Sequence, residues 1–182
     1  AALAGPRLVL SAGAPVPLEL MESIAEVFLT DAQRERFVAP TLAGDIVWCQ
    51  LFSEPEAGSD LAALRTRAER VDGGWRLDGQ KIWTSQAHNA QWAICLARTD
   101  PDAPKHKGIT AVLIDMSAPG VEVRPLRQIT GGSEFNEVFF TDARTAADLV
   151  VGEPGDLEVG DPLGRADVAV QPRHDEPRRE AV

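Results

Sequence analysis

The chain reads LFSEPEAGSD at residues 51–60 and GQKIWTS at residues 79–85, with a strand-turn-strand pattern between these two segments. Asp72-Gly73-Gly74 supplies the tight turn of that pattern, since glycine accepts a positive φ without a Cβ clash. Either segment alone would be a weak signal, because short motifs recur by chance. Their order, with one hairpin between them, predicts a β-domain with a polar loop that enters from an apolar strand.

Short β-type runs separated by turn residues continue on both sides of these segments. We predict seven strands, at residues 46–52, 63–71, 75–83, 90–98, 108–116, 121–125 and 137–141. Short strands at a spacing of roughly ten residues are typical of an antiparallel barrel or sandwich. The fold class predicted is therefore mainly β, with the proline-rich residues 100–108 as an exposed loop.

The two ends of the chain have different patterns. Apolar residues recur at helical spacing between residues 18 and 28, so we predict one or two helical segments over residues 17–38, ended by Pro40. Residues 157–182 are rich in Gly, Pro and charged side chains and have no sustained period. We predict that they form a poorly ordered tail.

Composition limits the possible functions. A chain of 182 residues has room for about one domain. Its net charge of -10 argues against nucleic acid as a partner, although local backbone N–H groups can still bind an anionic cofactor. Cys49 and Cys95 lie in apolar runs, which predicts buried structural thiols and a reducing compartment.

Targeting and metal signals are weak. Residues 1–17 lack an initiating Met and a basic leader, so we expect no signal peptide and no membrane span, and a cytoplasmic location. His88, His106 and His174 show no metal-ligand spacing, which argues against a zinc site. Dinucleotide, triphosphate and Ser-hydrolase fingerprints are absent from the sequence.

The residue types of the two segments suit a ligand. Ser53, Ser59 and Gly58 can offer hydroxyls and a closely approaching backbone to one molecule, although a plain turn with Ser59 or Asp60 as a helix cap is the commoner use of such residues. Trp83 beside two hydroxyl residues suits a planar heteroaromatic ligand. The alternative is that Trp83 is a core residue, as we expect for Trp75 and Trp92.

Together, the segments resemble the flavin-binding middle domain of the acyl-CoA dehydrogenase family, and the resemblance runs from about residue 45 to 156. It implies a β-domain between two helical domains, with FAD between the β-domain and the C-terminal helices. On that basis residues 1–44 are the remnant of an N-terminal helical domain, residues 45–151 are the β-domain, and residues 152–182 are an irregular tail where the C-terminal helices are absent.

The resemblance also implies roles for individual residues. The backbone at Phe52 and Ser53 would lie near the isoalloxazine, Trp83 would pack beside it, and Ser85 would bond its reactive side. Ser59 would contact the acyl-CoA substrate, and His106 falls near a further CoA-contact position in its loop. The full set implied for FAD is Gln50, Leu51, Phe52, Ser53, Gly58, Ser59, Trp83, Thr84 and Ser85. Leu51 and Phe52 stand where a small and an aliphatic residue are usual.

The activity implied is α,β-desaturation of an acyl-CoA thioester with hydride transfer to flavin N5, an electron-transfer flavoprotein as acceptor, and homo- or hetero-oligomers. The catalytic carboxylate is expected from the C-terminal domain, so no residue here is assigned as the base. Because agreement stops after residue 156, we expect a fragment, a frame-shifted product or a short variant, with weak or absent flavin retention. The alternatives are a non-catalytic module or partner subunit, and an acyl-CoA oxidase-like relative.

Overall fold

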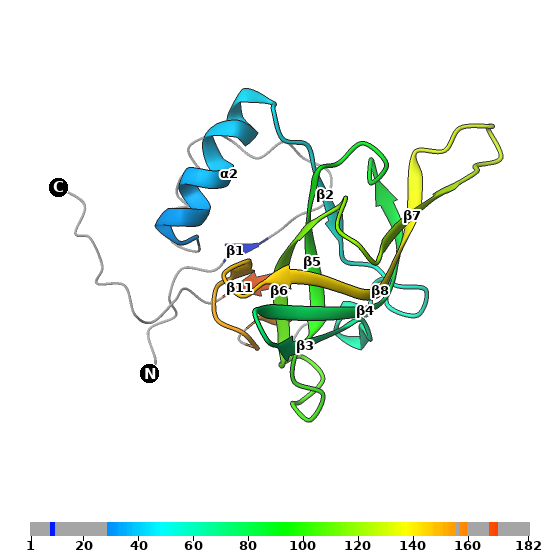
Figure 1. Ribbon diagram of the computed structural model, residues 1–182. Helices are drawn as coiled ribbons and strands as arrows, with labels where there is room; N and C mark the ends of the chain where they lie inside the picture. Colours follow the sequence, from blue (N-terminus) through cyan, green and yellow to red (C-terminus); the bar gives the residue numbers. More distant parts are fainter. Residues whose placement is uncertain (1–7, 10–28, 156, 160–167, 171–182) are drawn as a thin grey trace.

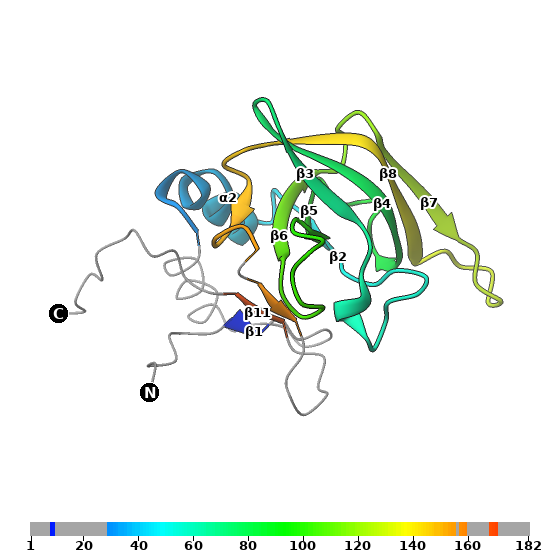
Figure 2. The same cartoon turned by 90° about the horizontal axis from the view of Figure 1, so that it is seen from below.

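The computed structural model describes residues 8–9, 29–155, 157–159 and 168–170 of the chain. Its main feature is an eight-stranded sheet that curls into a barrel (Figures 1 and 2). The strands are β2 (Trp48–Leu51), β3 (Arg67–Val71), β4 (Gly74–Ser85), β5 (Trp92–Arg98), β6 (Ile109–Asp115), β7 (Val121–Leu126), β8 (Phe135–Ala146) and β9 (Val150–Val151). The prediction of a mainly β fold is confirmed.

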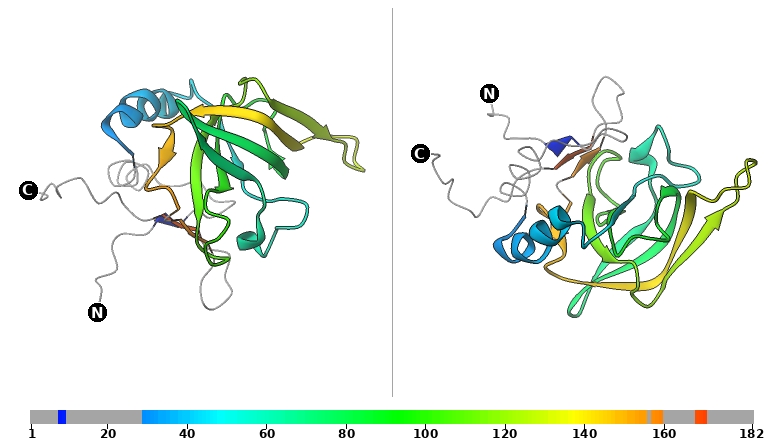
Figure 3. Two further views of the ribbon diagram at one scale, coloured as in Figure 1. Left: turned by 60° about the horizontal axis from the view of Figure 1, so that its bottom comes forward. Right: turned by 90° about the horizontal axis from the view of Figure 1, so that it is seen from above.

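The sheet order is β7-β8-β4-β3-β5-β6-β9, and β2 pairs with β5 beside this path. The far end of β8 returns to β6, where the Thr145 hydroxyl donates to the Leu113 carbonyl at 2.8 Å. Figure 3 shows the β7–β8 hairpin projecting from the barrel on the side away from α2 (Asp31–Ala43). The barrel is thus closed on one side and extended by a hairpin on the other.

Strand β5 has apolar residues on both faces because it separates two cores. Its odd-numbered residues Ala93, Cys95 and Ala97 lie in a barrel core with Leu51, whereas the even-numbered Leu96 lies in an outer core. This alternation follows from the two-residue period of a strand. Cys49 and Cys95 are both buried and unpaired, as predicted, and burial raises the pKa of Cys49 to about 12 and of Cys95 to about 11.

Helix α2 covers the outer core through Phe37. The Phe37 ring packs edge-on against Trp48 and Trp92, with ring centroids 5.3 and 4.8 Å away. The helix begins with a capping box in which Thr30 and Gln33 bond each other's backbone amides, and the Gln33 side chain also donates to the Val150 carbonyl at 2.9 Å. These contacts anchor the helix to the barrel wall.

The helix boundaries differ from the prediction. Pro40 lies inside α2 rather than ending it, and the helix stops at Gly44, which has φ 79° and donates its N–H to the carbonyls of Pro40 and Thr41. Proline removes one helical donor, and only three helical residues follow it here, so its cost is confined to the last turn. The predicted residues 17–28 lie outside the described residues.

The barrel is mainly antiparallel, as predicted, but β2 runs parallel to β5. The connection from residue 52 to residue 91 contains the β3–β4 hairpin, which provides the crossover that parallel pairing requires. Residues 61–63 form the 3-10 helix η1 (Leu61–Ala63), so the strand predicted from residue 63 begins only at Arg67. Strand β8 is longer than predicted.

The predicted tail contains two short strands. β10 (Glu158–Val159) and β11 (Val168–Val170) form a small antiparallel sheet with β1 (Leu8–Val9). This three-stranded sheet lies beside β6 (Figures 2 and 3). Leu157 and Val159 are buried in the outer core, and the Leu157 amide donates to the Ile109 carbonyl at 3.2 Å. Residues 156, 160–167 and 171–182 of that predicted tail lie outside the described residues.

Thr30→Ala is expected to lower the free energy of unfolding by about 1 kcal/mol, because it removes the side-chain acceptor of the capping box. Chemical denaturation measures the loss. Thr30→Ser keeps the hydroxyl and should retain most of the stability, and equal losses in the two variants would contradict a capping role.

Candidate functional site

The two sequence segments meet in space where β2 ends against β4. The Ile82 amide donates to the Ser53 carbonyl at 2.9 Å, so loop 51–60 begins directly beside the strand end formed by residues 83–85. Glu54 and Ala57 exchange two backbone hydrogen bonds, of 2.9 and 3.1 Å, and close the loop into a tight turn. Ser53 and Phe52 are half-buried, and Gln50 is exposed.

The strand end presents an aromatic face to solvent. The Trp83 side chain is 62% exposed, and the Phe135 ring lies edge-on to it at 6.1 Å. Trp83 has φ 60°, which is costly for a bulky residue and coincides with a register shift in the β4–β8 ladder. The core alternative is therefore wrong for Trp83, whereas Trp75 is buried in the barrel core and Trp92 is half-buried against the outer core.

The side chains of the two residues after Trp83 point to opposite faces of β4. Ser85 is exposed, and Thr84 is 2% exposed and faces inward. The Thr84 hydroxyl has no hydrogen-bond partner among the residues that the structure describes. Trp83 and Ser85 therefore offer an indole and a hydroxyl to a ligand, and Thr84 offers no more than its backbone.

The second half of loop 51–60 is joined to the loop that follows β5. Asp60 and Lys105 form an exposed ion pair at 2.5 Å, and no side-chain bond caps η1 from Asp60. The Arg98 guanidinium donates to carbonyls on both sides of this junction, those of Ala62, Leu64, Lys105 and Lys107. Gly58 and Ser59 are exposed beside this junction.

His106 lies on the same loop, next to Lys105, so the structure brings the region of Ser59 and that of His106 together. The His106 Nδ1 atom lies 2.8 Å from the Val159 carbonyl, and the Val159 amide donates to the His106 carbonyl at 3.2 Å. The imidazole is thus engaged with the chain segment that carries β10. Among the residues that the resemblance assigns to FAD, Leu51 has a fully buried side chain, so only its backbone could reach a ligand.

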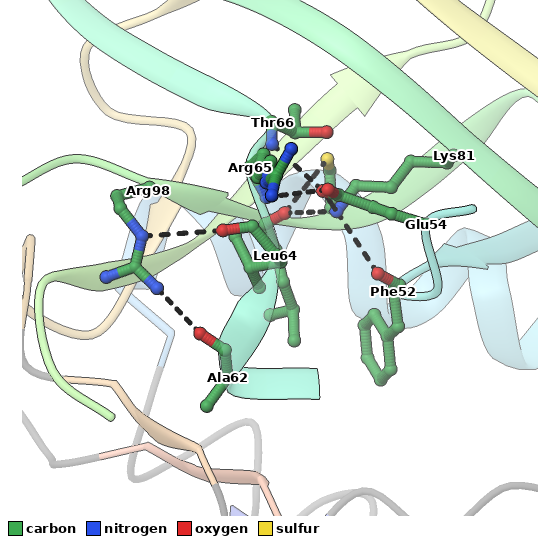
Figure 4. Close-up of polar contacts among 10 residues, drawn as sticks. Phe52, Glu54, Ala62, Leu64, Arg65, Thr66, Lys81 and Arg98 are labelled. Atoms are coloured by element: carbon green, nitrogen blue, oxygen red, sulfur yellow. Dashed lines mark hydrogen bonds and ion pairs between the residues drawn. The ribbon is translucent and has the colours of Figure 1, made fainter. Parts of the chain in front are cut away.

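Sequence reasoning missed a buried ion pair beneath the loop. Lys81 Nζ lies 2.7 Å from Glu54 Oε1, and the Lys81 side chain is fully buried (Figure 4). The Glu54 carboxylate also accepts from the amides of Arg65 at 2.6 Å and Thr66 at 2.9 Å. A usable signal existed, because Lys81 has the inward parity of Trp75 and Leu77 in the same strand.

Two opposed effects act on the Glu54 carboxyl. Burial by itself raises its pKa, but the Lys81 ammonium and the hydrogen bonds from Lys81, Arg65 and Thr66 outweigh burial, so the pKa lies below its usual value. Glu54 is therefore ionised at neutral pH.

The arrangement fits a flat, partly polar ring system. It combines an exposed indole at Trp83 and an exposed hydroxyl at Ser85 with the backbone of Ser53, which is hydrogen-bonded to the same strand at Ile82. Among the described residues there is no group of three or more His, Cys, Asp or Glu side chains that could hold a metal ion. Within the same residues no helix is long and apolar enough to cross a membrane.

A sequence model described as "Acyl-CoA dehydrogenase, middle domain" matches residues 49–143, just over half of the chain. The chain belongs to the acyl-CoA dehydrogenase family. This match covers both sequence segments and all of the strands from β3 to β7.

Relatives agree with this assignment. The chain is 64% identical over 127 residues to the acyl-CoA dehydrogenase FadE34 of Mycobacterium tuberculosis, covering 70% of this chain and 18% of that protein. It is 50% identical over 138 residues to the acyl-CoA dehydrogenase IpdE1 of the same organism, covering 76% of this chain and 36% of the relative.

Solved structures give the same answer. The structure titled "Tcur3481-Tcur3483 steroid ACAD" matches with a TM-score of 0.70 and 35% identity over 74% of this chain and 35% of that one. The "ChsE4-ChsE5 complex" of Mycobacterium tuberculosis matches with a TM-score of 0.68 and 34% identity, covering 79% of this chain and 38% of that one. The chain thus spans between about a fifth and two fifths of the length of these relatives.

Proposed function

We propose that this chain is the flavin-binding middle domain of an FAD-dependent acyl-CoA dehydrogenase. The observation that carries the proposal is the exposed, backbone-strained Trp83 beside Ser85 and the half-buried start of loop 51–60. A strained aromatic residue that faces solvent is costly for folding alone, which favours a ligand on its ring. Titles of two similar structures name FAD and FADH2 as bound groups of those proteins.

In this proposal each residue has a binding or orienting part. The Trp83 indole packs beside the isoalloxazine, the Ser85 hydroxyl donates a hydrogen bond to the ring, and Ser53 contributes its amide and hydroxyl. Gln50, Leu51, Phe52, Gly58 and Thr84 contribute backbone or flanking contacts. The bound flavin would supply the hydride acceptor for desaturation of the substrate.

The acyl-CoA would lie where loop 51–60 meets the loop after β5, with Ser59 and His106 as its contacts. The ion pair of Asp60 with Lys105 and the four carbonyl contacts of Arg98 hold these two loops together. For His106 to contact a substrate through Nδ1, its bond to the Val159 carbonyl would have to open.

Three glutamates of the β-domain, Glu54, Glu56 and Glu137, do not suit removal of a substrate proton. Glu54 is buried and held by Lys81, Glu56 pairs with Arg65 at the surface, and Glu137 accepts a hydrogen bond from the Gln80 side-chain Nε2. We therefore propose that the base comes from a separate helical domain. In this chain we assign residues 1–44 to the remnant of an N-terminal helical domain, residues 45–151 to the β-domain and residues 152–182 to the irregular tail. An electron-transfer flavoprotein as acceptor, a cytoplasmic location and assembly with like or unlike subunits belong to the same proposal.

A non-catalytic module is the second candidate. It is favoured because, within the described part of the chain, Glu54, Glu56 and Glu137 are each held by another residue. Such a module would still hold flavin or a partner subunit, and the titles of two similar structures each name a pair of proteins.

Titration of the full 182-residue chain with FAD tests the proposal. We expect weak binding with quenched flavin fluorescence, and a loss of roughly tenfold or more in affinity for Trp83→Ala, because ring stacking contributes about 1–3 kcal/mol. Trp83→Phe should keep part of the affinity.

Leu42→Ala is the matched control, since Leu42 is also a large exposed hydrophobic residue but lies on α2. It should bind as the unmodified chain does. An unmodified chain that binds no FAD at any accessible concentration, or a Trp83→Ala variant with unchanged affinity, would contradict the proposed function.

A further inference from the structure

The Lys81 ammonium is fully buried and uses all three of its N–H donors. It donates to the Phe52 carbonyl at 3.1 Å, to Glu54 Oε1 at 2.7 Å and to the Leu96 carbonyl at 2.7 Å (Figure 4). These acceptors belong to loop 51–60 and to β5, whereas Lys81 itself belongs to β4. One cation therefore joins three segments at the point where β2 ends.

The contact with Leu96 replaces a ladder bond. In the β2–β5 register, Gln50 lies opposite Ile94, and the Trp92 amide donates to the Val47 carbonyl. Continued by the same two-residue steps, this parallel ladder would have the Ser53 amide donate to the Leu96 carbonyl. Lys81 occupies that carbonyl instead, and the pairing stops at Leu51.

The contact with Phe52 then sets the direction of the Ser53 amide. In a trans peptide the C=O of one residue and the N–H of the next point in opposite directions. The Phe52 carbonyl points at Lys81 in the interior, so the Ser53 N–H points away from it, and no described residue accepts that N–H. The following peptide is held too, because the Ser53 carbonyl accepts from Ile82 and the Glu54 amide donates to Ala57.

We propose that the buried Lys81–Glu54 pair positions the backbone of residues 52–54, ending the β2–β5 ladder and turning the Ser53 amide outward as a donor for an anionic or carbonyl-bearing ligand. Under the proposed function, on which the identity of this ligand rests, the ligand is the flavin ring. Lys81 and Glu54 are positioning residues, since neither side chain reaches the ligand face.

Stability alone does not account for the pair. A buried ion pair is often no more stable than well-packed apolar residues of similar volume, because two charges must leave water. A methionine at position 81 could fill the volume but could not bind two carbonyls and a carboxylate at once. The charge thus adds a fixed backbone direction that apolar packing would not supply.

The double variant Glu54→Gln/Lys81→Met tests this role, because it removes both charges while nearly conserving volume. Its unfolding midpoint should stay close to that of the unmodified chain. The amide of Ile82, whose acceptor is the Ser53 carbonyl, should exchange with deuterium at least tenfold faster. Affinity for FAD should fall at least tenfold. Glu69→Gln/Arg76→Met, which removes an exposed ion pair near the other end of β4, is the matched control and should change neither.

The exchange measurement needs no flavin, so it separates the two proposals. If the unmodified chain binds no FAD but the Ile82 amide exchanges faster in the double variant, the proposed function fails and the positioning role stands. If exchange is unchanged, or the double variant binds FAD like the unmodified chain, the positioning role is overturned. If the double variant does not fold, the Lys81→Gln variant is measured with the Leu113 amide, which donates to the Leu149 carbonyl, as an internal reference. Faster exchange at Ile82 than at Leu113 supports the positioning role, and equal acceleration of both amides overturns it.

Discussion

Lys81→Met alone is expected to lower the free energy of unfolding at neutral pH by roughly 3–5 kcal/mol, because the Glu54 carboxylate would stay buried without its counter-charge. That loss is a large part of the stability of an ordinary domain. Urea denaturation should show a lower midpoint with an unchanged slope, and Arg76→Met, from an exposed ion pair, should leave the midpoint nearly unchanged.

The same variant should have an altered pH dependence. In the unmodified chain the pKa of Glu54 is lowered, so its contribution is present above the unfolded pKa of about 4.3 and is lost as pH falls through the folded value. Without Lys81, burial dominates and raises the pKa of Glu54. Protonation of Glu54 then removes the buried unpaired charge from the Lys81→Met variant. The difference in free energy of unfolding between the unmodified chain and the variant should therefore become smaller as the pH falls from 7 to 4. Parallel pH curves for the two proteins would contradict this account.

Leu51→Ala is expected to cost about 2–5 kcal/mol, because the Leu51 side chain is fully buried in the barrel core and its loss would leave a cavity. The affinity of the folded protein for FAD should change little, since only the Leu51 backbone lies near the proposed ligand surface. Denaturation and FAD titration of the same preparation measure both effects.

Leu42→Ala removes the same atoms from a side chain that is 46% exposed, and it should cost far less stability. A Leu51→Ala variant that is stable but loses FAD would show that the Leu51 side chain is part of the ligand surface.

The strands were predictable because they are short apolar runs whose side chains point alternately to the two faces of the sheet. β5 places Ala93 and Cys95 in one core and Leu96 in the other, and such apolar runs bounded by turn residues indicate strands without any tertiary information. The periodicity of a strand does not indicate which other strand it pairs with. The parallel pairing of β2 with β5 joins residues about 44 positions apart, so the local pattern of apolar residues does not indicate this one parallel pair in a mainly antiparallel barrel.

The prediction that Pro40 ends the helix was wrong, and nothing was predicted about Lys81, in both cases for local reasons. Pro40 predicts a helix end, but the Gly44 amide closes the last turn onto the Pro40 and Thr41 carbonyls and lets the helix continue past the proline. Lys81 reads as a surface charge because buried lysines are rare. Two features of the sequence could have indicated the buried pair. Lys81 is an even number of residues from Leu77 and so faces the interior with it, and the acidic residue Glu54 follows the apolar strand that ends at Leu51.

Arg98 binds the turn at Ala62 and Leu64 and the loop at Lys105 and Lys107 through one guanidinium. An insertion or deletion in either segment would move carbonyls away from a side chain that the other segment still holds. We expect the lengths of these two segments to co-vary among related sequences. A graft intended to change substrate preference would need to transfer both segments with Arg98 as a single block.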